Sequence, residues 1–330
     1  MKARALHFVA PRRVAVREEP LEPPGAGQVL VRTEVSAVSP GTEMLVYRGQ
    51  VPAGMAVDAI LPALAGGFRF PLKYGYAAVG RVAELGEGVG PEWRERLVLS
   101  FHPHESHFLA PPSELIPVPE GLSPEEAALL PNMETAVNFL MDGQPVVGER
   151  VVVFGQGVVG LLTTALLARF PLSSLVAVDP FPLRRRKSQE LGAHAALAPD
   201  ALDGLAASAD LTYEVSGSPA ALEAALAVTG FQGRIVIGSW YGDKRVSLDL
   251  GGAFHRSRIQ LVSSQVSSLD ARWTGRWSKA RRLEVAWRLL AELRPADLIT
   301  HRFPLAEAAA AYELLDRRPE EALQIVFTYV

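Results

Sequence analysis

Residues 151–168 read Val-Val-Val-Phe-Gly-Gln-Gly-Val-Val-Gly-Leu-Leu-Thr-Thr-Ala-Leu-Leu-Ala. This stretch predicts a buried strand, a glycine turn and a helix, and Asp179 follows at the end of the next apolar run. Gly155 allows a tight turn, Gly157 allows the backbone to approach a pyrophosphate, and Gly160 allows the helix to pack close to the sheet. The helix N-terminus offers unpaired N–H groups to phosphates. The pattern therefore predicts a dinucleotide site.

The same uncharged stretch is about long enough to span a membrane, but the glycines and the glutamine in its first half favour a turn. The other alternative is a related fold that binds no nucleotide, and Asp179 argues against it. A carboxylate at this position accepts hydrogen bonds from the adenosine ribose and repels a 2′-phosphate, which favours NAD over NADP. Arg184 and Arg185 lie nearby in sequence and could hold a phosphate, so NADP stays open.

Further cofactor contacts are expected where parallel strands end, because their carboxyl ends meet at one edge of the sheet. Ser216 follows a strand expected at 211–215, and Gly238-Ser239 closes one expected at 234–238. The complete predicted cofactor set is Gly155, Gln156, Gly157, Val158, Val159, Gly160, Asp179, Arg184, Ser216, Gly238 and Ser239.

The composition limits the class of protein. The chain has 330 residues, enough for two domains, with 48% hydrophobic and 21% charged residues. A net charge of −3 gives no electrostatic footprint for nucleic acid or an anionic membrane, so neither is an expected partner. The absence of cysteine excludes disulfides and thiolate zinc sites. The first residues lack the apolar core of a signal peptide, so a cytoplasmic location is expected.

Hydrophobic periodicity divides the chain into an all-β part, a part in which strands and helices alternate, and a helical return. The alternation predicts a doubly wound parallel sheet, and hence an α/β protein. Strands are expected at 3–9, 14–17, 29–38, 76–84, 97–101, 107–109, 151–154, 175–178, 211–215, 234–238, 259–263 and 323–328. Helices are expected from Ser123 onward and at 158–169, 184–191, 219–229, 281–293 and 305–315.

This organisation resembles the medium-chain dehydrogenase/reductase superfamily over essentially the whole chain. The landmarks are Ser39-Pro-Gly-Thr-Glu43, Gly75-Tyr-Ala-Ala-Val-Gly80, Leu130-Pro-Asn-Met-Glu-Thr-Ala136, the glycine turn and Leu298-Ile-Thr-His-Arg-Phe-Pro-Leu305. The resemblance implies a GroES-like catalytic domain of residues 1–135 and 271–330, and a Rossmann dinucleotide-binding domain of residues 136–270. Ser-Pro-Gly-Thr-Glu, Phe-His-Pro-His and Pro-Asn-Met-Glu-Thr-Ala are most similar to a branch related to the bacteriochlorophyllide hydroxyethyl dehydrogenases.

The zinc-dependent members of that superfamily carry ligands that this chain lacks. Pro40 stands where they have a cysteine, Tyr76 where they have a histidine, and only Glu134 occupies a ligand position. A catalytic zinc needs about three protein ligands, so no zinc is expected. The histidines of Phe101-His-Pro-His-Glu-Ser-His107 are alternative ligands, but their spacing favours a role in a cleft or a loop.

Without a metal, another group must donate a hydrogen bond to the reacting oxygen. By the resemblance, Tyr76, His102 and Thr42 are the candidates. Tyr76 alternatively packs against the barrel, and His102 alternatively lies on an exposed loop. Glu134 orients a donor or a water, or alternatively caps or pairs at the domain joint.

The residues that the resemblance places in the substrate cleft are apolar or aromatic, which favours a hydrophobic alcohol or carbonyl as substrate. They are Met44, Leu45, Tyr47, Phe101, Trp240 and Tyr241. The sequence thus predicts a zinc-independent oxidoreductase that uses NAD, or else NADP. The alternatives are an NADPH-dependent quinone or enoyl reductase and a non-catalytic nucleotide-binding protein. The resemblance also implies a homodimer, in which the last strand of the nucleotide sheet pairs with its twin, and Ile259-Gln-Leu-Val-Ser263 is apolar enough for that contact.

Overall fold

The computed structural model describes residues 1–52, 54–57, 62–64 and 66–329. The chain divides into two compact units: the first is Met1–Pro131 with Trp287–Val330, and the second is Asn132–Ala286. The later boundary falls inside helix α7 (Lys279–Leu293), whereas the resemblance implied a boundary at 270/271. Glu134, expected in the catalytic domain, accordingly lies in the second unit.

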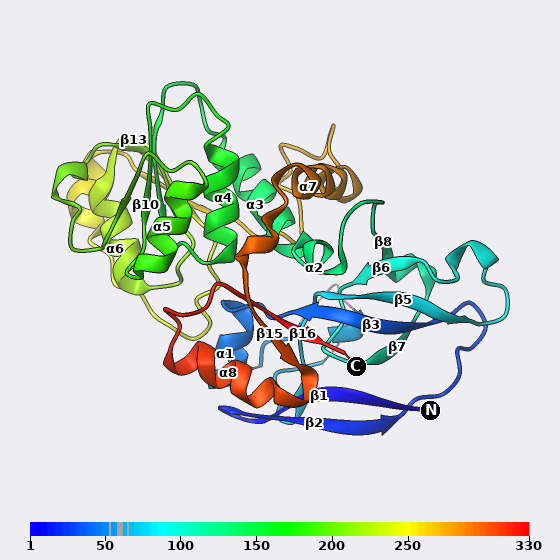
Figure 1. Ribbon diagram of the computed structural model, residues 1–330. Helices are drawn as coiled ribbons and strands as arrows, with labels where there is room; N and C mark the ends of the chain where they lie inside the picture. Colours follow the sequence, from blue (N-terminus) through cyan, green and yellow to red (C-terminus); the bar gives the residue numbers. More distant parts are fainter. Residues whose placement is uncertain (53, 58–61, 65, 330) are drawn as a thin grey trace. The chain divides into compact units, whose positions relative to one another are not determined.

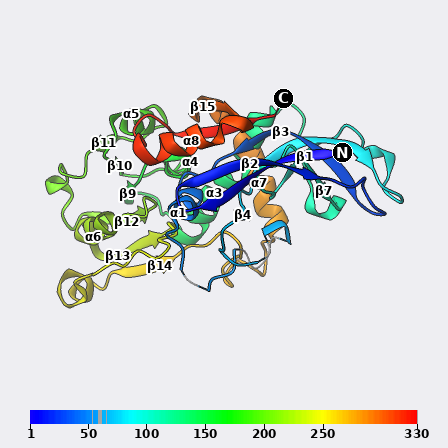
Figure 2. The same cartoon turned by 90° about the horizontal axis from the view of Figure 1, so that it is seen from below.

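A six-stranded parallel sheet forms the centre of the second unit. Its order is β11-β10-β9-β12-β13-β14, which can be followed from label to label in Figure 2. Val152 of β9 lies between Val176 of β10 and Thr212 of β12. The order reverses at β9, which is where dinucleotides bind in such sheets. The strands are β9 (Arg150–Phe154), β10 (Ser174–Val178), β11 (Ala195–Leu197), β12 (Ala209–Glu214), β13 (Thr229–Ile237) and β14 (Gln260–Ser263).

Both faces of this sheet are buried. Val152 and Phe154 pack in one core cluster, whereas Val151 and Val153 pack in another, as the alternation of side chains along a strand requires. Continuous apolar strands are typical of such doubly covered parallel sheets. Figure 1 shows helices beside the strands. They are α3 (Leu130–Gly143, whose first two residues belong to the first unit), α4 (Val158–Leu167), α5 (Pro182–Glu190) and α6 (Pro219–Val228).

The first unit contains two sheets. One has the order β2-β1-β4, and the other has the path β15-β16-β3-β5-β6-β8, with β7 also paired to β3. The strands are β1 (Lys2–Ala10), β2 (Arg13–Pro20), β3 (Val29–Ala37), β4 (Leu72–Lys73), β5 (Ala78–Leu85), β6 (Leu97–Ser100), β7 (His107–Ala110), β8 (Ile116–Pro117), β15 (Ile299–Pro304) and β16 (Gln324–Thr328). The α-helices wholly within it are α1 (Thr42–Arg48), α2 (Pro124–Ala127) and α8 (Ala308–Arg317).

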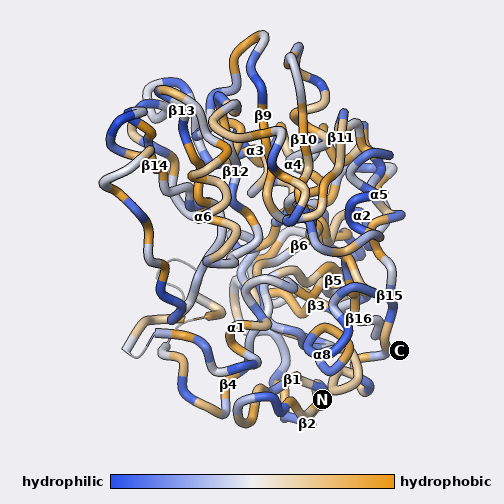
Figure 3. The backbone as a smooth tube through the Cα atoms, turned by 90° about the vertical axis from the view of Figure 1, so that its left-hand side faces the viewer, coloured by the Kyte–Doolittle hydropathy of each residue, from blue (hydrophilic) through white to orange (hydrophobic). Residues whose placement is uncertain are grey.

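The core of the first unit joins segments from both ends of the chain. Phe8 of β1 contacts Tyr312 of α8 edge-on, and Phe327 of β16 packs in the same cluster. The residues along much of β3 and β5 are hydrophobic, and those along α5 are more hydrophilic (Figure 3). Short turns of helix complete the fold: η1 (Pro62–Leu64), η2 (Pro91–Trp93), η3 (Pro112–Glu114), η4 (Asp203–Leu205), η5 (Leu250–Phe254), η6 (Pro295–Leu298) and η7 (Leu305–Glu307).

The expected α/β fold is confirmed, and each expected strand and helix matches an observed element within a few residues. Ser123 caps α2 as the sequence predicts, because its side chain accepts from the Glu126 N–H in a capping box. Helices α1 and α3 were not expected. No helix among the described residues is long and apolar enough to cross a membrane.

Candidate functional site

The glycine turn between β9 and α4 has the shape that the sequence predicts. Gly155 has φ +92°, and a Cβ there would lie 2.7 Å from the Ser216 backbone nitrogen. A Cβ on Gly160 would lie 1.9 Å from the Gly155 carbonyl oxygen, so only glycine lets the helix pack this closely. A Cβ on Gly157 would meet no atom within 4 Å. The turn is therefore tight on its inner side and open at Gly157, at the start of α4.

Asp179 lies directly after β10 and is held from two sides. Its Oδ2 accepts from the Gln156 backbone N–H at 2.7 Å, and its Oδ1 accepts from the Phe181 backbone N–H at 2.9 Å. Arg184 Nη1 lies 3.8 Å from Oδ2, and the guanidinium lies over the Phe181 ring. The carboxylate is thus fixed beside the glycine turn, with lone pairs left to accept further hydrogen bonds.

Gln156 has a different place from the one expected. Its side chain is fully buried, donates to the Val153 carbonyl at 3.2 Å and accepts from Thr164 Oγ1 at 3.0 Å. Its backbone N–H is used by Asp179. Gln156 therefore holds the turn together, and its side chain is not available to a cofactor. Val158 and Val159 begin α4, with Val158 buried.

Glu214, at the end of β12, organises the strand ends and was missed from the sequence. Its Oε1 accepts from the backbone N–H groups of Ser216 and Gly217, at 2.8 and 3.1 Å, and from Ser216 Oγ. Its Oε2 accepts from the Tyr241 hydroxyl at 2.7 Å. Burial raises the pKa of Tyr241, and the Glu214 charge raises it further. The sequence feature that could have pointed to Glu214 is a single acidic residue at the end of an apolar strand.

The loop after β13 is hydrogen-bonded to Glu214 as well. Ser239 Oγ donates to the Glu214 carbonyl at 3.4 Å, and a Cβ on Gly238 would lie 2.2 Å from the Phe139 ring. Ser216 and Ser239, both predicted, are therefore brought together at the carboxyl edge of the sheet. Trp240 is half-buried in this loop.

In the first unit, three hydroxyl groups gather at the start of α1. The Tyr76 hydroxyl donates to Ser39 Oγ at 2.5 Å. Burial raises the pKa of Tyr76, and hydrogen bonds with Ser39 and Thr42 oppose that rise. The predicted pair Tyr76 and Thr42 thus lies together, and Ser39 joins it. Ser39 was not among the predicted site residues, although it opens the Ser-Pro-Gly-Thr-Glu motif.

His102, for which an acid–base role was expected, lies in a ring stack. Its ring stacks on Phe108 with centroids 4.0 Å apart, and Nδ1 lies 3.3 Å from the Pro103 carbonyl oxygen. Burial lowers the pKa of His102 to about 4. The imidazole is therefore neutral at physiological pH, and an exposed loop histidine is also the wrong description.

Glu134, expected either to orient a donor or a water or to pair at the domain joint, forms an ion pair. Its Oε1 accepts from Arg282 Nε and Nη2, at 3.1 and 2.8 Å, and Arg282 is completely buried. Arg282 also donates to Asn138 Oδ1 at 2.5 Å. Glu134 is the acidic half of a buried ion pair, which agrees with the alternative that it pairs rather than orients a donor.

A second buried network was also missed. His104 Nε2 lies 3.1 Å from Glu43 Oε2, and Nδ1 lies 2.6 Å from Ser36 Oγ. The Tyr312 hydroxyl donates to Glu43, and the Tyr329 hydroxyl lies 2.6 Å from Ser36 Oγ. His104 is therefore fixed by a carboxylate and a hydroxyl, and does not point to the same place as His102.

The donor set does not fit a catalytic zinc. Pro40 offers no ligand, the Tyr76 hydroxyl is bonded to Ser39, and Glu134 is neutralised by Arg282. Within the described part of the chain, no three His, Cys, Asp or Glu side chains gather as metal ligands do. A catalytic zinc needs about three of them.

The predicted substrate residues differ in position. Met44 and Tyr47 belong to the core of the first unit, where Tyr47 stacks on Tyr312 with centroids 5.3 Å apart. This corrects their assignment to a cleft. Leu45 is buried, and Phe101 is half-buried.

Comparison with known proteins begins with a family model described as zinc-binding dehydrogenase, which matches residues 158–283. Sorbitol dehydrogenase 1 of Saccharomyces cerevisiae is 28% identical over 224 residues, which are 63% of this chain and 59% of that protein. The chain thus matches about three fifths of the length of this curated relative. D-guloside 3-dehydrogenase of Escherichia coli is 26% identical over 343 residues, which cover 97% of this chain and 98% of that protein.

The fold is also that of solved dehydrogenases. A short chain alcohol dehydrogenase from Escherichia coli, complexed with NADH, superposes with a TM-score of 0.78 at 18% identity. The superposition covers 99% of both chains. Over residues 158–283 the chain is thus similar to zinc-binding dehydrogenases, and over nearly its whole length it shares the fold of a solved alcohol dehydrogenase.

Proposed function

We propose that the protein is a zinc-independent, NAD(P)-dependent oxidoreductase that interconverts an alcohol and a carbonyl compound. The observation that carries the proposal is the fixed carboxylate of Asp179 beside an open glycine turn. The backbone at Gly157 is open to a dinucleotide, because a Cβ there would meet no atom within 4 Å. When bound, the nicotinamide donates or accepts a hydride.

The chain itself binds and orients the cofactor. The N-terminus of α4 would present its N–H groups to the pyrophosphate, and Asp179 would accept from the ribose hydroxyls. NAD is proposed over NADP, because Asp179 repels a 2′-phosphate and the side chain of Arg185 is engaged with the Asp179 and Pro180 carbonyls. Glu214 fixes the loops that carry Ser216 and Ser239 at the edge of the sheet.

Hydroxyl groups take the place of a Lewis acid in this proposal. Tyr76 and Thr42 would hold the proton that joins or leaves the substrate oxygen. The Tyr76 proton, which the structure shows donated to Ser39 Oγ, would turn to the substrate oxygen when substrate binds. The support for zinc independence is the chemistry of the donors: a proline, a bonded tyrosine and a neutralised glutamate stand at the ligand positions.

We keep the proposal of a hydrophobic substrate on the apolar character of Phe101 and Trp240, which are both half-buried. Relatives of this chain are named for sorbitol and for a D-guloside, so polyols belong in any test. The branch near the bacteriochlorophyllide hydroxyethyl dehydrogenases, the homodimer and the cytoplasmic location also remain predictions.

A substrate panel with NADH and NADPH tests the reaction. Hydrophobic alcohols and ketones, polyols, quinones and enones are each supplied, and nicotinamide absorbance at 340 nm is followed. Turnover of an alcohol or ketone is the expected result. Turnover of enones or quinones alone would favour a reductase of C=C bonds, and cofactor binding with no turnover would favour a non-catalytic nucleotide-binding protein.

Metal analysis tests the mechanism separately. Protein purified without added zinc should carry far less than one zinc per chain, and chelators should leave turnover unchanged. One zinc per chain, whose loss abolishes turnover, would overturn the zinc-independent mechanism while leaving the oxidoreductase in place.

A further inference from the structure

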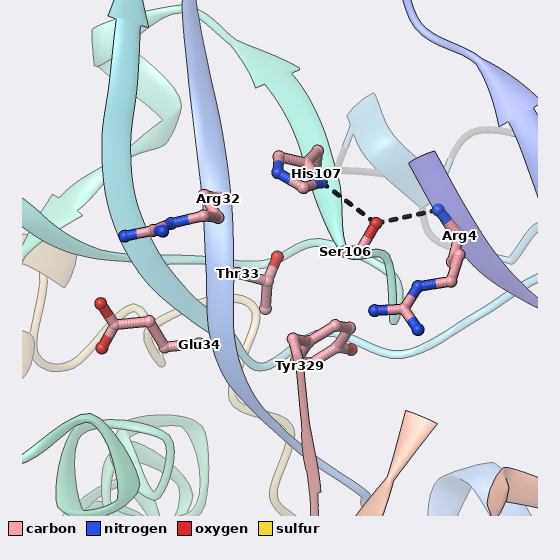
Figure 4. Close-up of a pocket in the computed structure, with 7 residues that line it drawn as sticks. All are labelled: Arg4, Arg32, Thr33, Glu34, Ser106, His107 and Tyr329. Atoms are coloured by element: carbon pink, nitrogen blue, oxygen red, sulfur yellow. Dashed lines mark hydrogen bonds between the residues drawn. The ribbon is translucent and has the colours of Figure 1, made fainter. Parts of the chain in front are cut away.

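A hollow of about 340 Å³ opens in the first unit, where residues from β1, β3, the start of β7 and the end of the chain meet. This volume is within the range of small-molecule sites. Figure 4 shows its residues, which are Arg4, Arg32, Thr33, Glu34, Ser106, His107 and Tyr329. None of them belongs to the predicted cofactor or substrate set.

Backbone and side-chain bonds build the wall of the hollow. Ser106 Oγ accepts from the Arg4 backbone N–H at 2.8 Å, and the Arg4 carbonyl accepts from the Ser106 N–H at 2.8 Å. The Ser106 carbonyl accepts from the Thr33 N–H at 3.0 Å. Three segments distant in sequence are thereby fixed around one point.

Thr33 supplies the observation that points to a ligand. Its side chain is 2% exposed and lines the hollow, and its Oγ1 has no hydrogen-bond partner in the described structure. A buried hydroxyl without a partner is uncommon, because an unmade hydrogen bond costs about 1–3 kcal/mol. A hydrogen-bond acceptor bound in the hollow would supply the missing partner of Thr33 Oγ1.

The charge around Thr33 defines the kind of acceptor. Figure 4 shows Arg4, Ser106, His107 and Tyr329 on the same side of β3 as Thr33, with Arg32 and Glu34 on the other side. The Glu34 carboxylate pairs with Arg81 at 3.0 Å, so its charge is compensated. Burial lowers the pKa of His107, and the charges of Arg32 and Arg4 lower it further, which indicates a positive local potential.

We propose that this hollow binds a small oxyanion, such as the phosphate group of a metabolite. Thr33 Oγ1 would donate to one oxygen, and the Arg4 guanidinium would face the charge, as arginine does in phosphate sites. The proposal is independent of the oxidoreductase reaction, since none of its residues belongs to the predicted cofactor set.

Titration with inorganic phosphate at constant ionic strength tests the site, with backbone amide chemical shifts as the readout. The wild-type protein should show saturable shifts at Thr33, Ser106 and His107. Thr33→Val and Arg4→Met should each raise the dissociation constant about tenfold or more, because each removes a donor to a charged group. Thr33→Ser keeps the hydroxyl and should retain binding.

Arg94→Met, an exposed arginine outside the hollow, is the matched control and should bind as the wild type does. Shifts confined to Gly157 and Val158 would mean that phosphate binds only the glycine turn, and would overturn the proposal. Unchanged binding in both Thr33→Val and Arg4→Met would overturn it as well.

Discussion

In the proposed function, the choice between NAD and NADP depends on the carboxylate of Asp179. A 2′-phosphate would bring like charge within hydrogen-bonding distance of it, so the wild-type protein should bind NADH much more tightly than NADPH. Asp179→Ser should narrow or reverse the preference, because Arg184, now 3.8 Å from the carboxylate, is released. Fluorescence titration of both cofactors measures this. Equal or tighter NADPH binding by the unmodified protein would contradict the role of Asp179, though not the dinucleotide site.

His102 gives stability a dependence on pH. Its folded pKa of about 4 lies below the ordinary value of 6.5, so the unfolded chain binds more protons between these two values. Stability is therefore lost as the pH falls from 6.5 towards 4, by about 3 kcal/mol for this group. His102→Phe should flatten the pH dependence of the unfolding free energy over that range and leave turnover at pH 7 nearly unchanged. If the unfolding free energy of the variant kept the wild-type pH dependence, or if its turnover fell strongly, a purely structural role for His102 would be contradicted.

At the scale of elements, α3 and α7 are joined by the buried pair of Glu134 and Arg282. Removing one partner of such a pair leaves an uncompensated buried charge, which costs about 3–5 kcal/mol. Arg282→Met should lower the unfolding free energy in urea by that amount. The double variant Arg282→Met/Glu134→Gln should recover part of it, because no lone charge remains.

Arg288→Met is the control for that experiment, since Arg288 is exposed on the same helix and its ion pair with Glu292 is a surface pair. It should change stability by well under 1 kcal/mol. A similar loss in Arg288→Met and Arg282→Met would show that the effect comes from the helix rather than from the buried pair.

Features that depend on the spacing of residues along one segment could be predicted from the sequence. Features that depend on side-chain contacts between segments distant in sequence could not. The glycine turn, Asp179 and the alternation from β9 to β14 follow from spacing along one segment. The contacts of Glu134 with Arg282 and of His102 with Phe108 could not be predicted, because only the fold brings these partners together. Ser39 could have been found, because it opens a motif that was recognised.

At the scale of the whole molecule, β14 is the edge strand of the six-stranded sheet, and Leu261 on it is 37% exposed. An exposed apolar edge favours pairing with a second copy. We expect a light-scattering mass near twice 35.6 kDa for the wild type and near 35.6 kDa for Leu261→Lys. A wild-type mass near that of one chain at micromolar concentration would contradict the dimer.

The network around His104 also has a consequence for synthesis on the ribosome. Glu43 and Ser36 emerge early, but their partners Tyr312 and Tyr329 emerge last. The second unit is one continuous segment, Asn132–Ala286, and is fully translated before them. We therefore expect the second unit to fold first, before Glu43 and Ser36 can meet these two tyrosines. The N-terminal strands are thus translated first but complete their packing last.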